Sequence, residues 1–208
     1  MPKIIDHDER RARLAAAALN VIRRGGVDAA TIRGIAAEAG WSRGVVEHYF
    51  GSRDELLSFC YRHALAAAFP EFDRLREIDD PRERLVRALV IGLPSDENTR
   101  LDNELWLDFL GRLRGNLALR QTLAEVNDEW IARIGELVQQ CADDDRYVVT
   151  HDLPTCAQLL SHFVDGASVS AALYPEQASA EQQLILARAM VDGIVVPRAA
   201  SETPGARP

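Results

Sequence analysis

The stretch Thr31–Leu57, "TIRGIAAEAGWSRGVVEHYFGSRDELL", decides the fold. Its apolar residues follow a helical period as far as Gly40, pause, and then resume the same period. Thr31 is a good helix N-cap, because its hydroxyl can accept a backbone N–H of the first turn. Gly40 tolerates the left-handed backbone conformation that ends many helices. The stretch therefore predicts two short helices, at 31–39 and 42–49, joined by a tight turn.

The two short helices have apolar faces that can pack together. Ile35 and Ala36 lie on the inner face of the first helix, and Val46 and Phe50 lie on the inner face of the second. The residues left facing outward on the second helix are Arg43, Gly44, Val45, Glu47 and His48. This pattern predicts a helix-turn-helix, whose second helix can enter the major groove of DNA. The spacing alone also fits an ordinary corner between two helices.

Helical periodicity continues along the rest of the chain, and no alternating strand pattern is evident. The fold class predicted from the sequence is therefore all-α, with about nine helices. The stretch 143–154 reads as a polar loop, and the helix that begins near Ser52 is expected to end at Pro70. We expect three segments: a DNA-binding domain at 1–52, a second helical domain at 53–196, and a disordered tail at 197–208.

Charge is distributed unevenly between these segments. The chain has a formal net charge of −8, yet residues 1–54 carry nine basic and seven acidic side chains. The remaining 15 basic and 25 acidic side chains make the rest of the chain strongly acidic. This asymmetry suggests different partners for the two parts.

Composition excludes several other classes of protein. No apolar run is long enough to span a membrane, and the charged N-terminus lacks the apolar centre of a secretory signal. Cys60, Cys141 and Cys156 are scattered and odd in number, which favours buried thiols in a reducing cytoplasm. We expect a cytoplasmic protein with no membrane partner.

The opening stretch also resembles the signature of TetR-family transcriptional regulators. The resemblance lies in the helix that starts with threonine, "IAAEAG", a hydrophobic residue followed by serine, "HYF" and "GSRDELL". Further on, "ELWLDFLGRLRGNLALRQ" and "HFVDGASVSAALYP" are similar to the ligand-binding domain of the BetI-like subgroup. The resemblance implies a homodimeric regulator, most simply a repressor, that binds a near-palindromic double-stranded operator. It also implies a small-molecule effector of unknown identity.

The resemblance further implies which residues contact DNA. Thr31 and Arg33 would contact phosphates beside the groove, and His48, Tyr49 and Arg53 would clamp backbone phosphates. The recognition surface would be Ser42, Arg43, Gly44 and Val45, and Glu47 on the same helix departs from the family pattern. Many relatives carry an aromatic residue where Glu47 stands. This carboxylate either pairs with an arginine or accepts from a cytosine amino group, and the sequence leaves both open.

Apolar stripes in the second domain predict a ligand cavity and a dimer interface. Polar side chains lie close to two tryptophan-bearing stripes, and an indole face in an acidic domain can hold a cation. The expected ligand-binding residues are Asn103, Trp106, Phe109, Leu110, Leu113, Asn127, Trp130, His162, Phe163 and Asp165. The last two helices are apolar around much of their circumference, and the expected interface residues are Leu159, Phe163, Leu184, Ala187, Met190 and Val191.

Two other functions remain open from the sequence. His162 and Asp165 are three residues apart on one helix and could act as an acid–base pair in an all-α enzyme. However, no nucleophile motif, phosphate loop or metal-ligand cluster accompanies them, so we expect no enzyme, cofactor or metal. The second alternative is a DNA-binding regulator that takes no small-molecule ligand.

Overall fold

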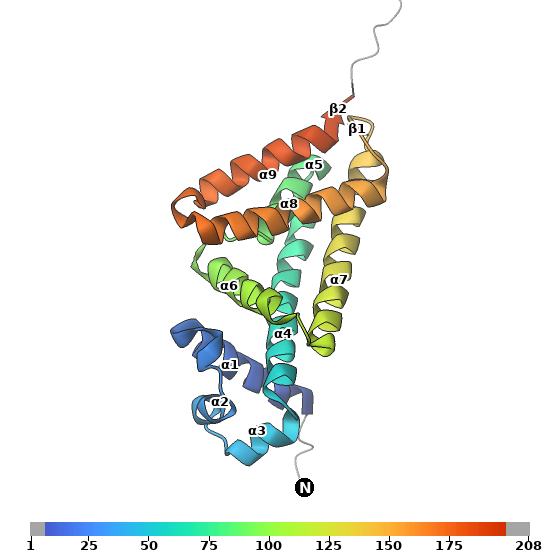
Figure 1. Cartoon of the computed structure of the whole chain (residues 1–208). Coiled ribbons are helices and arrows are strands. Elements are labelled where there is room, and N and C mark those ends of the chain that lie inside the picture. Colours follow the sequence, from blue (N-terminus) through green and yellow to red (C-terminus); the bar gives the residue numbers. More distant parts are fainter. Residues whose placement is uncertain (1–6, 199–208) are drawn as a thin grey trace, which may run out of the picture.

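Helix α4, Arg53–Arg74, runs through most of the length of the molecule and connects its two ends (Figure 1). The computed structural model of the chain describes residues 7–198. One end holds α1 (His7–Ala29), α2 (Ile32–Ala39) and α3 (Arg43–Tyr49). The other end holds α5 (Pro81–Ile91), α6 (Glu97–Arg112), α7 (Leu117–Ala142), α8 (Leu153–Leu173) and α9 (Ala180–Ile194). Short 3-10 turns follow α4 at Leu75–Glu77 and α8 at Pro175–Gln177.

The turn between α2 and α3 forms as the sequence predicts. The Thr31 hydroxyl accepts the backbone N–H of Gly34 at 3.0 Å, which caps the start of α2. Gly40 takes the left-handed conformation, with φ at 68°, and ends that helix. Ser42 stands at the N-cap position of α3, but its side chain makes no capping hydrogen bond. Serine is a preferred N-cap residue, so the sequence predicts a side-chain cap at Ser42, and this prediction is wrong.

Helix α4 continues past Pro70, where the sequence analysis predicted its end. A proline inside a helix cannot donate the backbone hydrogen bond, which normally weakens the helix at that point. Here Phe72 and Leu75 follow the proline and are buried in the core of the C-terminal domain. Their packing compensates for the missing hydrogen bond, and the helix continues to Arg74.

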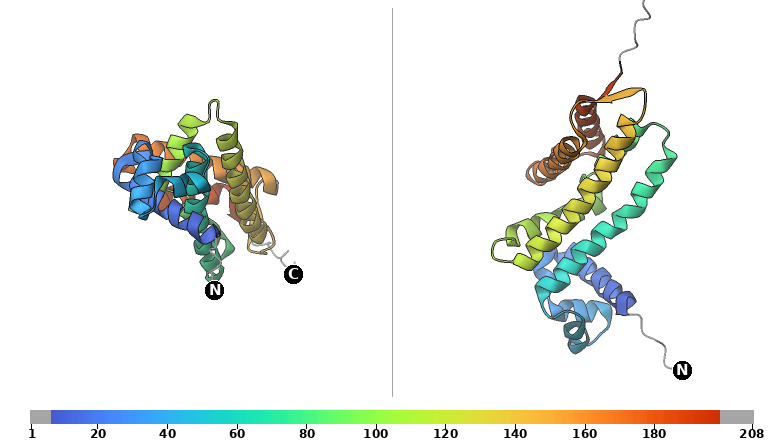
Figure 2. Two further views of the ribbon diagram at one scale, coloured as in Figure 1. Left: turned by 90° about the horizontal axis from the view of Figure 1, so that it is seen from below. Right: turned by 90° about the vertical axis from the view of Figure 1, so that its right-hand side faces the viewer.

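Helices α4 and α7 run side by side along the molecule, and α8 crosses them on one side (Figure 2). Helix α6 lies between the N-terminal helices and α8, so it contacts α1, α4 and α8. Helix α9 packs mainly on α5 and closes the far end of the domain.

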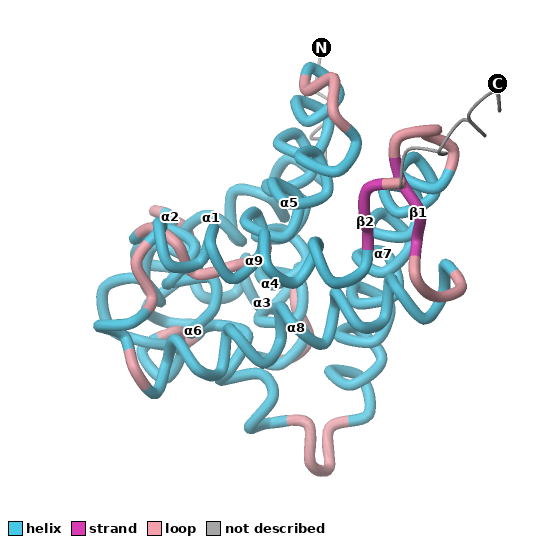
Figure 3. Tube along the Cα trace, turned by 90° about the horizontal axis from the view of Figure 1, so that it is seen from above, coloured by secondary structure: helices cyan, strands magenta, loops and turns pink. Residues whose placement is uncertain are grey.

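Two short strands join the ends of α7 and α9, in contrast to the polar loop that the sequence predicted at 143–154. Strand β1 (Tyr147–Val149) pairs antiparallel with β2 (Val195–Pro197), with Val148 opposite Val196 (Figure 3). β-branched valines favour this extended pairing, although three residues are too few to show an alternating pattern in the sequence. The Arg198 guanidinium donates to the carbonyl oxygens of Asp145 and Tyr147. The pairing thus includes Pro197 and Arg198, which were predicted to belong to the tail, while residues 199–208 lie outside the described range.

Two clusters of buried apolar side chains form the core of the molecule. The first cluster contains residues of α1, α2, α3 and α4, together with Leu105 and Phe109 from α6. The second cluster contains residues of α4, α5, α7, α8 and α9. The N-terminal helices therefore do not form a core alone, because one face of α6 belongs to it. The opposite face of α6 looks toward the C-terminal helices.

The three cysteines are buried and unpaired, as the sequence predicts. Burial raises the pKa of the Cys60 and Cys141 thiols to about 12. Both thiols therefore stay protonated near neutral pH, and they fill space in the core.

The architecture confirms the predicted fold class, an all-α chain with an N-terminal helix-turn-helix and a C-terminal helical domain. Within residues 7–198, no helix is both long enough and apolar enough to cross a membrane.

Candidate DNA-binding surface and cavity

Helix α3 is held against the body of the molecule by one face and is open on the other. Val46 and Phe50 are buried in the N-terminal core, whereas Arg43, Gly44 and Glu47 are exposed. A Cβ placed on Gly44 would meet no heavy atom within 4 Å, so this position faces open space. A small residue there lets the backbone of α3 approach another surface closely. The outward face has the shape expected of a recognition helix.

In the chain without DNA, Glu47 forms an ion pair with an arginine, which is one of the two roles that the sequence leaves open. Nε of Arg43 donates to Oε1 of Glu47 at 2.8 Å, one helical turn away. A second arginine–carboxylate pair joins Arg24 on α1 to Glu38 on α2. This second pair lowers the pKa of Glu38, chiefly through the hydrogen bond from Arg24. The N-terminal helices therefore carry two arginines that are oriented by carboxylates, one of them on α3.

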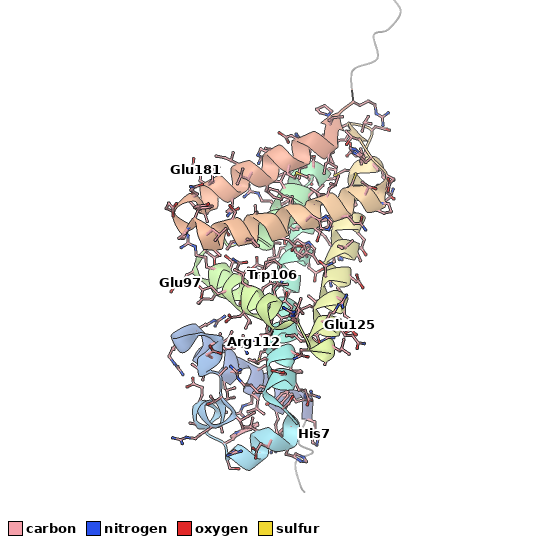
Figure 4. The ribbon with its side chains drawn as sticks, in the orientation of Figure 1. His7, Glu97, Trp106, Arg112, Glu125 and Glu181 are labelled. Carbon is pink, nitrogen blue, oxygen red and sulfur yellow. The ribbon has the colours of Figure 1, made fainter. Side chains whose placement is uncertain are left out.

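A hollow of about 420 Å³ lies beside α3, and its lining combines Gly44 and Val45 with basic and polar side chains. His7 and Arg10 from α1 line it together with His48 and Tyr49 from α3, and Figure 4 shows His7 close to α3. Nη1 of Arg10 lies 3.4 Å from the Tyr49 hydroxyl oxygen and donates to it. The sequence analysis missed His7 and Arg10, although the basic run at 10–13 was a usable signal. This hollow is a candidate seat for a backbone phosphate.

Arg53 is engaged inside the protein, although the family resemblance gives it a phosphate. Its Nε donates to the carbonyl oxygen of Ala30 at 2.9 Å, and Nη2 donates to that of Val27. These bonds brace the turn after Gly26, whose φ of 74° interrupts α1. Arg53 therefore positions the start of α2, while Arg33 remains exposed on that helix.

A cavity of about 370 Å³ lies between α4, α5, α6, α7 and α8. Trp106 faces it from α6, in the middle of the molecule (Figure 4), and Trp130 faces it from α7. The Trp130 ring stands edge-on to Phe72, with ring centroids 5.4 Å apart. A Cβ on Gly92 would lie 2.7 Å from the Trp130 ring, so only glycine lets the end of α5 approach this tryptophan.

Two half-buried carboxylates face the same cavity. Burial raises the pKa of both Asp102 and Asp165 above the ordinary value, and it is opposed by Arg23 for Asp102 and by His162 for Asp165. Burial also raises the pKa of Tyr61, and the charges of Asp165 and Asp102 raise it further. Within residues 7–198, neither carboxylate has a basic group at ion-pair distance. The cavity therefore combines aromatic faces with two carboxylates that form no ion pair among the described residues.

Most of the predicted ligand-binding residues meet at this cavity, but two do not. Those that line it are Asn103, Trp106, Leu110, Leu113, Asn127, Trp130, His162 and Asp165. Phe109 is not among the lining residues, because it packs edge-on against Tyr61 inside the N-terminal core. Phe163 also lies off the wall, in partial contact with the C-terminal core. Lining residues that the sequence analysis missed include Tyr61, Phe72, Gly92, Thr99, Asp102, Arg120 and Ser168.

The polar neighbours of the tryptophans are partly satisfied within the chain. Nδ2 of Asn103 donates to the Ser168 carbonyl oxygen at 3.0 Å, which ties α6 to α8. The Ser161 hydroxyl donates to Oδ1 of Asn127 at 3.4 Å. These bonds orient the amides at the cavity, whereas no hydrogen bond or ion pair is found for the carboxylates of Asp102 and Asp165 among the described residues.

The outer face of α8 and α9 exposes large apolar side chains, namely Leu159, Val169, Leu173, Ile185 and Leu186. Of the predicted interface residues, Leu159 is exposed, and Phe163, Leu184 and Met190 are half-buried. Ala187 and Val191 are fully buried in the core of the single chain, packed toward α5. Those two side chains therefore do not lie on the surface of the single chain, whereas Ile185 and Leu186 on the same helix are exposed.

An exposed second helix on a helix-turn-helix places the chain in the class of helix-turn-helix DNA-binding proteins. Residues 14–58 match the family described as bacterial regulatory proteins, tetR family. Residues 81–196 match the BetI-type transcriptional repressor, C-terminal domain. The chain belongs to the TetR family of transcriptional regulators.

Named relatives and a solved structure agree with this assignment. The HTH-type transcriptional regulator PksA of Bacillus subtilis (strain 168) is 31% identical over 179 residues, which cover 84% of this chain and 84% of PksA. The regulator BetI of Burkholderia mallei (strain NCTC 10229) is 28% identical over 200 residues, which cover 95% of this chain and all of BetI. A transcriptional regulator from Saccharomonospora viridis, crystallised in complex with choline, has a TM-score of 0.79 at 24% identity. That match covers 92% of this chain and all of the other, and it shows the shared fold.

Proposed function

We propose that this regulator is a repressor that binds a near-palindromic operator as a homodimer and releases it when a small cation fills the cavity. The observation that carries the proposal is the double role of α6. Asp102 and Trp106 of this helix face the cavity, whereas Leu105 and Phe109 are buried in the core of the DNA-binding end. A ligand that moves α6 therefore acts directly on the packing of α1 and α4.

The surface of α3 supports operator binding. Arg43 is exposed and can bind a guanine edge, and Gly44 allows close approach to the groove. The hollow lined by His7, Arg10 and His48 supports contact with a phosphate beside it.

The outer face of α8 and α9 supports a homodimer. Leu159, Leu173 and Ile185 are exposed on neighbouring helices, and an apolar face of this kind is usually covered. A twofold partner on this face would make an isologous interface of four helices. Two recognition helices related by that twofold axis could read half-sites about 34–36 Å apart, one turn of DNA.

The charge of the cavity supports a cationic effector. Asp102 and Asp165 are half-buried beside Trp106 and Trp130, and indole faces attract cations. Arg120 also lines the cavity, but it is exposed. The relative from Saccharomonospora viridis was crystallised with choline, which is a cation. We place the cation of the effector between the two carboxylates and the two indoles.

An ion pair offers a second connection from α6 to the DNA-binding end. Nη2 of Arg112, at the last turn of α6, lies 2.7 Å from Oδ1 of Asp28. The same carboxylate lies 3.7 Å from Arg53, which braces the start of α2. The effector can shift the DNA-binding equilibrium only by its difference in affinity for the two conformations. We propose that the Arg112–Asp28 ion pair is one of the contacts that differ between them.

A mobility-shift experiment tests the proposal with the full-length protein. Duplexes from the region upstream of its own gene are bound, and tetramethylammonium, choline and benzyltrimethylammonium are then titrated in. We expect at least one duplex to be retarded and at least one cation to release it. The neutral isostere of choline, 3,3-dimethylbutan-1-ol, is the matched control and should leave the complex intact.

Each failure has a different meaning. If no duplex is retarded under low salt, operator binding by this surface is contradicted. If a duplex is retarded but no cation releases it, the protein is a DNA-binding regulator that does not respond to such a ligand. If choline and its neutral isostere act equally, the carboxylates are not the recognition element.

A further inference from the structure

The ion pair between Arg43 and Glu47 lies in the open, on the face of α3 that points away from the core. The two side chains are 71% and 46% exposed, and their contact is the 2.8 Å bond from Nε to Oε1. Exposed pairs one helical turn apart contribute little to stability, because solvent screens them. The main consequence of the pair is therefore the orientation of Arg43.

The contact uses only one edge of the guanidinium. An arginine has five N–H donors, one on Nε and two on each Nη. Glu47 accepts from Nε, and the part of the chain that the structure describes gives Nη1 and Nη2 of Arg43 no hydrogen-bond or ion-pair partner. Guanine presents O6 and N7 side by side in the major groove and accepts from two such donors. The two nitrogens of Arg43 that Glu47 leaves available, Nη1 and Nη2, can therefore donate to O6 and N7 of a guanine.

The pair between Arg24 and Glu38 has the opposite geometry. Nη1 of Arg24 donates to Oε1 of Glu38 at 3.2 Å, and Nη2 donates to Oε2. Both terminal nitrogens of Arg24 therefore donate to Glu38, and the contact joins α1 to α2. This pair braces two helices, whereas the pair on α3 leaves its arginine able to bind a second acceptor.

We infer that Glu47 is a specificity-determining residue that positions Arg43 to read a guanine in the operator. The inference rests on the proposed operator binding by α3. The carboxylate restricts the arginine before DNA arrives, so less side-chain freedom is lost on binding. Its charge also repels phosphates, which weakens binding wherever Arg43 finds no guanine to offset that cost. Glu47 thus lowers affinity for DNA in general and raises selectivity for the operator.

Base preference can be measured with the full-length protein on a randomised duplex library, for wild type, Glu47→Ala and Glu47→Gln. In Glu47→Ala, we expect discrimination at the base pair read by Arg43 to fall about tenfold. Binding to non-operator DNA should rise about threefold at low salt, because a negative charge is removed from the surface. In Glu47→Gln, the amide oxygen can still accept from Nε, so most of the discrimination should return while the rise in non-operator binding persists.

Two controls isolate the role of positioning. Glu38→Gln removes the same charge from the same domain and should leave base preference unchanged. Arg43→Ala identifies the base pair at issue, and adding Glu47→Ala to it should cause no further loss there.

Three results would overturn the inference. Identical base preference in wild type and Glu47→Ala would show that Glu47 does not position Arg43. If the Arg43→Ala variant keeps a base preference and the Arg43→Ala, Glu47→Ala double variant loses it, then Glu47 reads a base itself. If Arg43→Ala also leaves all preferences unchanged, α3 does not read this DNA, and the proposed function fails together with the inference.

Discussion

At the DNA-binding end, arginines are held by acceptors within the chain, whereas in the cavity two aspartates lie half-buried with no basic group at ion-pair distance in residues 7–198. Arg43 is oriented by Glu47, and Arg53 is bound to backbone carbonyls. These two arginines are thus oriented before a partner arrives. The cavity instead carries a charge that costs stability while it stays empty.

Helix α6 separates these two environments and belongs to both. Its buried side carries Phe109 into the N-terminal core, while Asp102 and Trp106 face the cavity. The difference between its faces predicts that neighbouring residues on one helix affect different properties of the protein.

The largest expected effect comes from Phe109→Ala. Phe109 is 1% exposed and packs against Tyr61 at a ring-centroid distance of 5.3 Å. Truncating a buried phenylalanine costs about 3–5 kcal/mol of unfolding free energy, measured by urea denaturation. Leu110→Ala is the matched control, because Leu110 is exposed at the cavity and should cost far less. Equal losses in both variants would contradict the division of α6 into two faces.

A smaller effect is expected from Arg53→Ala, which removes two hydrogen bonds from a charged donor. Such bonds are worth about 1.5–3 kcal/mol in buried settings, and Arg53 is partly exposed, so we expect a loss near the lower end. Because Arg53 binds carbonyls, the salt dependence of operator affinity should not change. Arg33→Ala should instead lower the slope of log affinity against log salt by about 0.9 if Arg33 neutralises one phosphate. A lower slope of log affinity against log salt in Arg53→Ala would show that Arg53 contacts a phosphate after all.

Asp102→Asn should make the empty protein more stable at pH 7, by less than the preceding changes. Burial raises the pKa of Asp102 in the folded protein above its value in the unfolded chain. The contribution of Asp102 to stability is therefore fully present below the unfolded pKa and is lost as the pH rises through the folded pKa. At pH 7 the ionised carboxylate is therefore destabilising, and a neutral amide removes that cost. Asp108→Asn, on the same helix but exposed, is the control and should leave the melting temperature unchanged. A lower melting temperature for Asp102→Asn would contradict this reading of the cavity.

The smallest effect concerns pH. Asp102 and Asp165 must be ionised to attract a cation, and burial raises the pKa of both. Binding of tetramethylammonium, followed by tryptophan fluorescence, should weaken as pH falls, and it should do so above the pKa of about 3.9 of an ordinary aspartate. Trp41→Phe removes the tryptophan that lies outside the cavity and provides the background for this titration. Affinity that stays constant down to the ordinary aspartate range would exclude both carboxylates from the site.

The helix-turn-helix could be predicted from sequence because its signals are local. A threonine cap, a glycine in the left-handed region and two apolar faces all lie within one short stretch. The engagement of Arg53 could not be predicted in this way. Its acceptors, Val27 and Ala30, lie more than twenty positions earlier and offer only backbone oxygens, which leave no mark in a sequence pattern.

The cavity was predicted in part, for a related reason. Trp106 and Trp130 mark it because large aromatic side chains near polar ones are unusual in a core. Asp102 was missed because helical spacing alone does not show which acid on α6 points inward. Phe109 was assigned to the cavity because α6 is apolar on two sides, and only the tertiary packing decides which side meets Tyr61.

The most direct test of the central claim is a calorimetric titration of a releasing cation into the free protein and into its operator complex. Coupling between two sites is reciprocal, so the operator must weaken cation binding by the same factor by which the cation weakens operator binding. We predict equal factors in wild type and little cation binding in the Asp102→Asn, Asp165→Asn double variant. Equal cation affinity with and without operator would contradict the claim that this cavity controls DNA binding.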